Sequence, residues 1–273
     1  MSRNNAQKLA PLAEQLEQPA IKRQGYMIPT DFVTLPSEGK LYPEGHPLRN
    51  KEDVEIKYMT TKEEDILTSP SYNEKGVVFD KLIESLMIDN IKADSLLIGD
   101  KNAILINART NAYGEIYSVM VPCIQCFEAQ QLDINLKELN IKKIDPLINF
   151  TEKGTFLVEL PKTKALVEMR LLSGEDEKEV VQRAAQKAKH NLPEEAVTDR
   201  YRQMIVSVDG NEDILAINQF ITSMPITDSR HLAKKYGEVS PDVEFTYTSE
   251  CSKCNHINKG VLPVTGDFFW PEQ

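Results

Sequence analysis

The hydrophobic pattern of the chain contains one motif twice, an alternating strand followed by an acidic helix start. Val54–Thr60 (VEIKYMT) alternates apolar and polar residues, as a half-buried strand does. Either Thr60 or Thr61 then stands three residues before a glutamate and fits a capping box. Ala165–Leu172 (ALVEMRLL) alternates in the same way, and Ser173 precedes a second acidic start. These junctions predict the same strand–helix unit in both halves of the chain.

Helices and a further pair of strands are predicted after each junction. The helical faces are marked by apolar residues at helical spacing: Phe79, Leu82, Ile83, Leu86 and Met87 in the first half, and Tyr201, Met204, Ile205, Val208, Ile214, Ile217 and Ile221 in the second. Asp94-Ser95 and Asp228-Ser229 are predicted helix N-caps. The predicted strands are Glu115–Pro122 and Gln130–Leu136 around one Cys-x-x-Cys turn, and Val243–Thr248 and Val261–Val264 around the other.

The repeated order of elements predicts an α+β protein. We interpret it as a tandem duplication of a strand–helices–strand–Cys-x-x-Cys knuckle–strand unit. The first α+β half is predicted at residues 26–150 and the second at residues 151–273, each with one knuckle. A chance resemblance between two strand–helix junctions is the alternative, because the identity between the halves is low.

Residues 1–25 differ from both halves in composition. They are polar, rich in Gln and Ala, and contain no aromatic residue. We predict an N-terminal arm that is flexible or docks on a neighbour. In Tyr26–Pro47, four prolines and two glycines exclude a long helix. We expect this segment to lie extended along a surface, where it contacts partner proteins.

The cysteines are the strongest chemical signal in the sequence. They form two Cys-x-x-Cys motifs, which are more often metal ligands than disulfides in a reducing compartment. Zinc prefers four tetrahedral ligands, and each motif supplies two thiolates from one tight turn. We predict that one structural Zn²⁺ joins the two halves in a zinc-ribbon-like site; four free thiols are the alternative. The predicted ligands are Cys123, Cys126, Cys251 and Cys254.

Charge and hydropathy narrow the classes of partner. The formal net charge is −10 and the pI is about 5.1, which does not supply the basic face that nucleic acid or an anionic membrane requires. No window approaches the roughly 18 consecutive apolar residues of a membrane span. The start of the chain lacks the apolar stretch of a secretory signal, so we expect a reducing cytoplasm.

The sequence predicts no catalytic site. Both Cys-x-x-Cys motifs lie between predicted strands, whereas a redox motif requires a following helix. Asp228, Ser229 and His231 lie close together, but they are better interpreted as a helix cap and first turn than as a hydrolase triad. His256 is interpreted as an exposed loop residue, with a role beside the metal as the alternative. The sequence contains no G-x-S-x-G, P-loop, G-x-G-x-x-G or H-E-x-x-H motif.

Four features occur together in a specific order. They are the segment LPSEGKLYP at Leu35–Pro43, the segment VEIKYMTTKEEDIL from Val54, the paired Cys-x-x-Cys turns, and the tail DFFWP at Asp267–Pro271. In this order they resemble the tail-baseplate proteins of T-even-like contractile-tailed phages. That family includes a baseplate hub subunit and a related hub assembly protein. The resemblance spans residues 26 to 271.

The resemblance implies a protein that builds the tail baseplate through contacts with other baseplate or tail proteins. It implies a location in the virion tail baseplate, and in the host cytoplasm during assembly. It supplies no catalytic residues, so we predict that the chain is not an enzyme and binds neither nucleic acid nor membrane; self-association is left open. The alternative functions are a zinc-ribbon nucleic-acid-binding protein and an enzyme of another kind.

Overall fold

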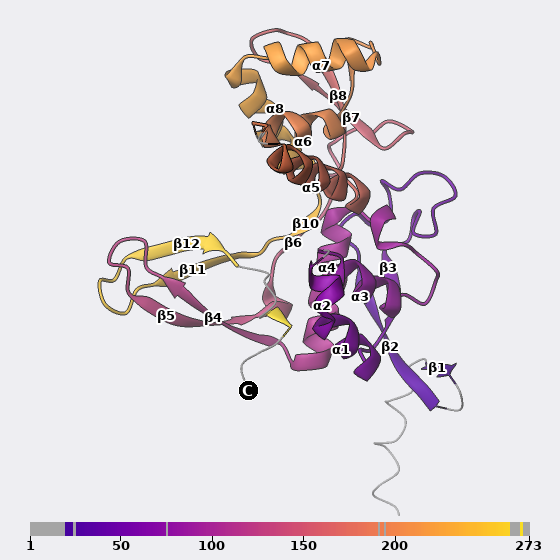
Figure 1. Ribbon diagram of the computed structural model, residues 1–273, viewed down its shortest axis with the longest axis vertical. Coiled ribbons are helices and arrows are strands. Elements are labelled where there is room, and N and C mark those ends of the chain that lie inside the picture. The colour runs from indigo at the N-terminus through magenta and orange to yellow at the C-terminus, as the bar shows by residue number, and fades with distance from the viewer. Residues whose placement is uncertain are drawn as a thin grey trace, which may run out of the picture.

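The computed structural model describes residues 20–23, 26–74, 76–190, 192–193, 195–262 and 268–269. Two parts that contain the helices lie one above the other, and two long β-hairpins project together to one side (Figure 1). The mixed α+β class is therefore confirmed. Within the described residues, no helix combines the length and the apolar character needed to cross a membrane.

The first half contains a small antiparallel sheet and a group of helices. In the sheet, the central strand β2 pairs with β1 on one side and with β3 on the other. The strands are β1 (Ala20–Arg23), β2 (Tyr26–Thr34) and β3 (Asp53–Lys57). The helices are α1 (Thr61–Thr68), α2 (Pro70–Glu74), α3 (Val78–Leu86) and α4 (Ile98–Tyr113), with a 3₁₀ turn η1 (Ala93–Ser95) before α4.

The second half contains a three-stranded antiparallel sheet in which β8 is central. The strands are β7 (Thr155–Glu159), β8 (Leu166–Arg170) and β9 (Ile205–Val208). The helices are α5 (Gly174–Lys189), α6 (Ala196–Met204), α7 (Ile214–Ser223) and α8 (Ile226–Val239). The predicted helical face that included Ile205 and Val208 is wrong beyond Met204. The β-branched run Ile205-Val206 favours a strand, and the free edge of β8 accepts it.

Both predicted strand–helix junctions are present. Of the two candidate caps for α1, Thr60 is the one used: the Lys62 N–H donates to its hydroxyl, and the Glu63 carboxylate accepts from its N–H at 2.9 Å. Ser173 caps α5, and the Asp176 carboxylate accepts from the Ser173 N–H at 2.8 Å. Since β3 and β8 both lead directly into these boxes, each sheet is tied to its first helix in the same way.

The register of the strand pairs also matches between the halves. Glu55 of β3 accepts a hydrogen bond from the Thr30 hydroxyl of β2 at 2.6 Å. Glu168 of β8 accepts one from the Thr155 hydroxyl of β7 at 2.5 Å. In each case the threonine lies two residues before the residue that faces the glutamate across the sheet. The two hairpins therefore share their pairing and their cross-strand contacts.

A buried aspartate anchors a loop in each half. Asp100, in the first turn of α4, accepts from the N–H of Ser37 at 3.0 Å. Asp228, in the first turn of α8, accepts from the N–H groups of Lys162 at 2.8 Å and Thr163 at 3.0 Å. Each carboxylate thus connects a helix N-terminus to the loop beside the sheet of the same half.

The predicted Asp-Ser caps are wrong in position. Pro225 is the cap residue of α8, and Asp228 is the third residue of the helix. Asp94 lies in η1, while Leu97 caps α4. The sequence favours the aspartates as caps because a carboxylate can accept hydrogen bonds from the free N–H groups at a helix start. Asp228 instead satisfies the N–H groups of a loop that is distant in sequence.

The two hairpins that project in Figure 1 follow α4 and α8. They are formed by β4 (Ile116–Pro122) with β5 (Ala129–Asn135) and by β11 (Thr246–Glu250) with β12 (Ile257–Val261). The predicted single strand at Val243–Thr248 is divided, because β10 (Asp242–Val243) pairs instead with β6 (Ile141–Lys142). The 3₁₀ turn η2 (Leu136–Glu138) separates β5 from β6.

One continuous hydrophobic core includes residues from both halves. The halves also meet through Asp80 of α3, which lies 2.7 Å from the Lys101 Nζ of α4 and 2.8 Å from the Lys178 Nζ of α5. Near the chain end, Phe268 and Phe269 are buried against the first half, and Arg109 Nε donates to the carbonyl of Phe268 at 2.8 Å. Trp270 lies outside the described residues.

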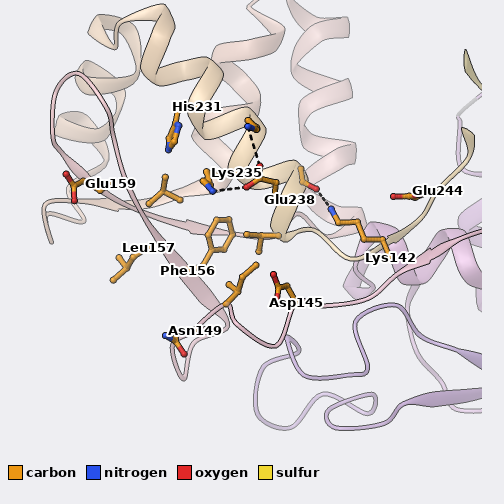
Figure 2. A pocket seen from close by; sticks show the side chains of 15 residues that line it. Lys142, Asp145, Asn149, Phe156, Leu157, Glu159, His231, Lys235, Glu238 and Glu244 are labelled. Atoms are coloured by element: carbon orange, nitrogen blue, oxygen red, sulfur yellow. Dashed lines mark hydrogen bonds and ion pairs between the residues drawn. The ribbon is translucent and has the colours of Figure 1, made fainter. Parts of the chain in front are cut away.

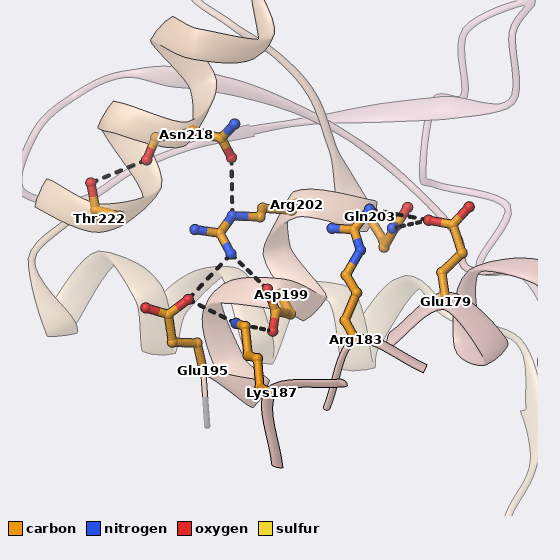
Figure 3. Close-up of polar contacts among 9 residues, drawn as sticks. All are labelled: Glu179, Arg183, Lys187, Glu195, Asp199, Arg202, Gln203, Asn218 and Thr222. Atoms are coloured by element: carbon orange, nitrogen blue, oxygen red, sulfur yellow. Dashed lines mark hydrogen bonds and ion pairs between the residues drawn. The ribbon is translucent and has the colours of Figure 1, made fainter. Parts of the chain in front are cut away.

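Ion pairs between side chains also join the helices of the second half. The buried Asp199 of α6 lies between the Lys187 Nζ of α5 at 2.7 Å and the Arg202 guanidinium at 2.6 Å (Figure 3). Arg202 Nε donates to Asn218 of α7 at 3.0 Å. This network fixes α5, α6 and α7 relative to one another.

The predicted arm falls mostly outside the described residues, which omit 1–19 and 24–25. Its described part, Ala20–Arg23, forms strand β1 and pairs with Tyr26–Pro29 of β2.

Candidate metal centre

Each Cys-x-x-Cys motif forms a tight knuckle at the end of a β-hairpin. In the first knuckle, the Cys123 N–H donates to the Glu128 carbonyl at 2.8 Å, and the Phe127 N–H donates to the Cys123 carbonyl at 2.9 Å. The second knuckle contains the same two bonds, from the Cys251 N–H to His256 at 2.8 Å and from the Asn255 N–H to Cys251 at 2.9 Å. Both motifs therefore lie between strands, as predicted.

The chain turns back in both knuckles through a residue in the left-handed region. Phe127 has φ = 60° and Asn255 has φ = 56°. Each is the residue directly after the second cysteine of its motif. Both knuckles therefore use the same left-handed position to reverse the chain.

The structure brings all four predicted ligands together. Their Sγ atoms lie within 4.8 Å of one another. Two of the sulfur–sulfur distances cross between the knuckles: 3.7 Å from Cys123 to Cys254 and 3.6 Å from Cys126 to Cys251. Four thiolates about 2.3 Å from one zinc ion would lie about 3.8 Å apart at the corners of a tetrahedron. The residues present therefore fit a four-thiolate metal site.

The electrostatics of the cluster favour a cation. The N–H groups of Cys126 and Gln125 lower the pKa of the Cys123 thiol to about 6. The N–H of Lys253 has the leading part in lowering the pKa of Cys251. The N–H of His256 lowers the pKa of Cys254, but burial and the neighbouring sulfurs outweigh it and raise that pKa to about 12. Four thiolates at these distances repel one another, and a divalent ion removes the repulsion.

A pair of side-chain amides crosses between the hairpins. Asn258 of β12 accepts from the N–H of Ile124 in the first knuckle at 3.1 Å. Gln130 of β5 accepts from the N–H of Ser252 in the second knuckle at 3.3 Å. Each amide lies four residues after the last cysteine of its own motif. The sequence analysis did not identify either residue, although an amide at the same spacing after both motifs could have indicated a shared role.

The structure gives His256 and the residues of the rejected hydrolase triad other surroundings. The metal-ligating cluster found among the described residues contains four cysteines and no His256. The Asp228 carboxylate binds the N–H groups of Lys162 and Thr163, while the Ser229 hydroxyl lies 3.0 Å from the Tyr201 hydroxyl. Asp228 therefore anchors a loop.

Comparison with known proteins places the chain in a family. A family model described as "T4 bacteriophage base plate protein" matches residues 27–270, which is most of the chain. No curated protein and no solved structure matches the chain. The family match begins within β2 and includes the second sheet, both knuckles and the buried Phe268 and Phe269. The chain therefore belongs to the family of T4 bacteriophage base plate proteins.

Proposed function

We propose that the protein is a structural or assembly component of a phage tail baseplate that acts through protein–protein contacts and is not an enzyme. The observation that carries this proposal is the family match over residues 27–270. Its partners are other baseplate or tail proteins. Its place is the virion tail, with the host cytoplasm as the site of assembly.

One structural zinc ion fastens the two halves in this proposal. The support is the set of four Sγ atoms within 4.8 Å, with two sulfurs from each half. Four thiolates are typical of zinc or iron sites, and a full shell leaves no position for a reacting water. The ion therefore stabilises the ribbon and performs no chemistry.

A tandem duplication accounts for the shape of this site. Cys251 follows Cys123 by 128 positions (251 − 123), and Asp228 follows Asp100 by the same number (228 − 100). The capping boxes, the strand register, the knuckle hydrogen bonds and the crossed amides support the same correspondence. In this view residues 26–150 and 151–273 are two copies of one unit, and the four sulfurs meet on the pseudo-twofold axis between them.

Deletion of the gene tests the baseplate function. Particles from a host infected with the deletion phage are expected to lack complete, infectious tails in negative-stain images. A plasmid copy of the full chain should restore them. Normal, infectious tails without this protein would refute the proposal.

Metal analysis tests the zinc site. The purified chain should contain one zinc per molecule, and Cys123→Ser combined with Cys251→Ser should remove it, because each knuckle loses one thiolate. Ser252→Ala, which lies in the second knuckle but alters no sulfur, is the matched control and should retain the metal. Full zinc in the double variant would exclude a shared site.

A further inference from the structure

The ribbon, formed by the hairpins β4–β5 and β11–β12, projects from the body of the molecule (Figure 1). The knuckles with the four cysteines lie at one end of these hairpins, and the base of β4, next to α4, lies at the other. Contacts at the base can therefore set the direction of the ribbon separately from the candidate metal centre. One buried side chain, Arg109 of α4, lies at this base.

Arg109 joins three segments of the chain. Its Nε donates to the carbonyl of Phe268 at 2.8 Å. Its Nη2 donates to the carbonyl of Ile116, the first residue of β4, at 3.1 Å, and its Nη1 donates to the carbonyl of Gly114. One guanidinium thus connects a helix of the first half to the first hairpin and to residues that follow the second hairpin.

Phe268 and Phe269, which we call the aromatic strap, are packed against the first half. Both side chains are almost fully buried. The Phe268 ring meets the Tyr117 ring of β4 edge-on, with the centroids 5.1 Å apart, and the Phe269 ring lies 5.6 Å from Phe79 of α3. Because the strap follows β12 in sequence, it brings the chain that leaves the second hairpin onto α3, α4 and β4.

A second segment crosses between the halves in the opposite direction. Residues 142–149 follow the first hairpin and line a cavity whose other walls are β7 and α8 of the second half (Figure 2). Lys142 Nζ donates to the carbonyl of Gly237 in α8, and the Phe150 ring lies 6.1 Å from the Phe156 ring of β7. Each hairpin is therefore followed by residues that pack on the other half.

The two crossings differ in the surroundings of their cations. The hydrogen bond from Lys142 to Gly237 is exposed, whereas the Arg109 side chain is 1% exposed. Burial lowers the pKa of Arg109, because a charged guanidinium is less stable away from water. Breaking the Arg109 contacts returns this charge to water, which offsets part of the packing that is lost. Opening this contact therefore costs less free energy than the buried rings alone would require.

We propose that Arg109 and the aromatic strap form a latch, which fixes the ribbon to the first half and opens while both halves remain folded. Opening breaks the three Arg109 hydrogen bonds and withdraws both rings, and the ribbon then moves about its base with its four cysteines still together. In the proposed baseplate function, on which this role rests, the closed latch presents the ribbon to partner proteins in one direction. The latch itself is tested on the purified full chain, so its failure is distinct from a failure of the baseplate function.

Arg109→Met tests the latch, because methionine retains an apolar stem and removes all three hydrogen bonds. In the purified full chain, hydrogen exchange at residues 114–118 and 268–269 should rise by about tenfold or more. Exchange in α6 should stay within about twofold of the wild type, and the metal content should not change. Arg183→Met, which removes an exposed ion pair with Glu179 on α5, is the matched control and should leave exchange at the base unchanged.

Two genetically encoded spin labels measure the direction of the ribbon. One replaces Met120 of β4 and the other replaces Asp65 of α1; both side chains are exposed. The distance distribution between the labels should be narrow in the otherwise unchanged protein. It should broaden or gain a second peak when Arg109→Met is added. An unchanged distribution would overturn the latch.

The unaltered protein supplies a test that depends on no substitution. At urea concentrations below the unfolding transition, the amides of residues 114–118 and 268–269 should exchange through one common opening, about a hundredfold more often than the amides in the middle of α8. Separate openings for the base and the strap, or rates equal to those of α8, would contradict the latch. A rise in exchange across α6, α7 and α8 in Arg109→Met would also overturn it, because Arg109 would then support the entire fold.

Discussion

Two residues with the same backbone conformation differ in how well they tolerate it. Asn255 and Phe127 both have φ near 60°, a region that asparagine adopts readily and a bulky residue does not. The Phe127 ring is 81% exposed, so it returns little packing energy for the strained conformation. The strain in the first knuckle therefore comes from having phenylalanine at position 127. The turn itself is not the cause, because asparagine adopts the same conformation in the second knuckle.

Phe127→Asn should therefore stabilise the protein. The expected gain in the free energy of unfolding is about 1 kcal/mol, because the strain is relieved and few contacts are lost. Urea denaturation of the zinc-loaded protein measures it. Asn255→Phe is the matched reverse change and should lower stability by a similar amount. A loss of stability in Phe127→Asn would mean that the ring contributes contacts that outweigh the strain.

At the scale of elements, the sequence predicted what depends on local pattern. The alternation in Val54–Thr60 and the cap at Ser173 are properties of adjacent residues, and both are present in the structure. The helical spacing of Ile205 and Val208 predicts a helix, but both residues belong to strand β9, which pairs with the edge of β8. Contacts across long separations, such as Asp228 with Lys162, were not accessible from local pattern.

In the candidate metal centre, too, the sequence predicted the residues of the local motif but not those that act through a contact distant in sequence. The four cysteines could be identified from the sequence because paired Cys-x-x-Cys motifs are typical of metal ligands. In the structure their Sγ atoms lie within 4.8 Å of one another. Gln130 and Asn258 were missed because amides are common on strands. Their role depends on the position of the opposite knuckle, which only the folded chain defines.

The contact between α3, α4 and α5 gives a prediction at this scale. Asp80 is buried, and the hydrogen bonds from Lys101 and Lys178 lower its pKa although burial alone raises it. A lowered pKa means that the carboxylate stabilises the fold above its ordinary pKa near 3.8, and that this stabilisation is lost as the pH falls through the lower value.

Asp80→Asn should destabilise the protein by about 2 kcal/mol at neutral pH, because two partly buried ammonium groups lose their common partner. The difference from the wild type should be constant between about pH 5 and pH 8 and should shrink below about pH 4. Thermal melting across this range measures it. Lys81→Met, which removes an exposed ion pair with Glu84, is the control and should have little effect. An undiminished difference at pH 3 would contradict the role assigned to the Asp80 charge.

At the scale of the whole molecule, the hairpins and the two halves differ in what stabilises them. The halves share a continuous apolar core, whereas alternate residues of β11 are exposed and the β4–β5 hairpin buries little beyond Tyr117 and Val121. Two-stranded hairpins are marginal in water without further support. The ribbon therefore depends on the four sulfurs and the ion that we propose they bind.

Removal of the metal by a chelator should consequently loosen the ribbon and leave the halves folded. Hydrogen exchange of residues 116–135 and 246–261 should rise about tenfold or more, since metal binding supplies folding free energy at such sites. Exchange in α4 and α8 should change little, because their protection comes from the core. The Cys123→Ser, Cys251→Ser variant should show the same pattern without chelator. If exchange rises equally in the helices, the ion supports the entire fold, and the two halves have no stability of their own apart from the site that joins them.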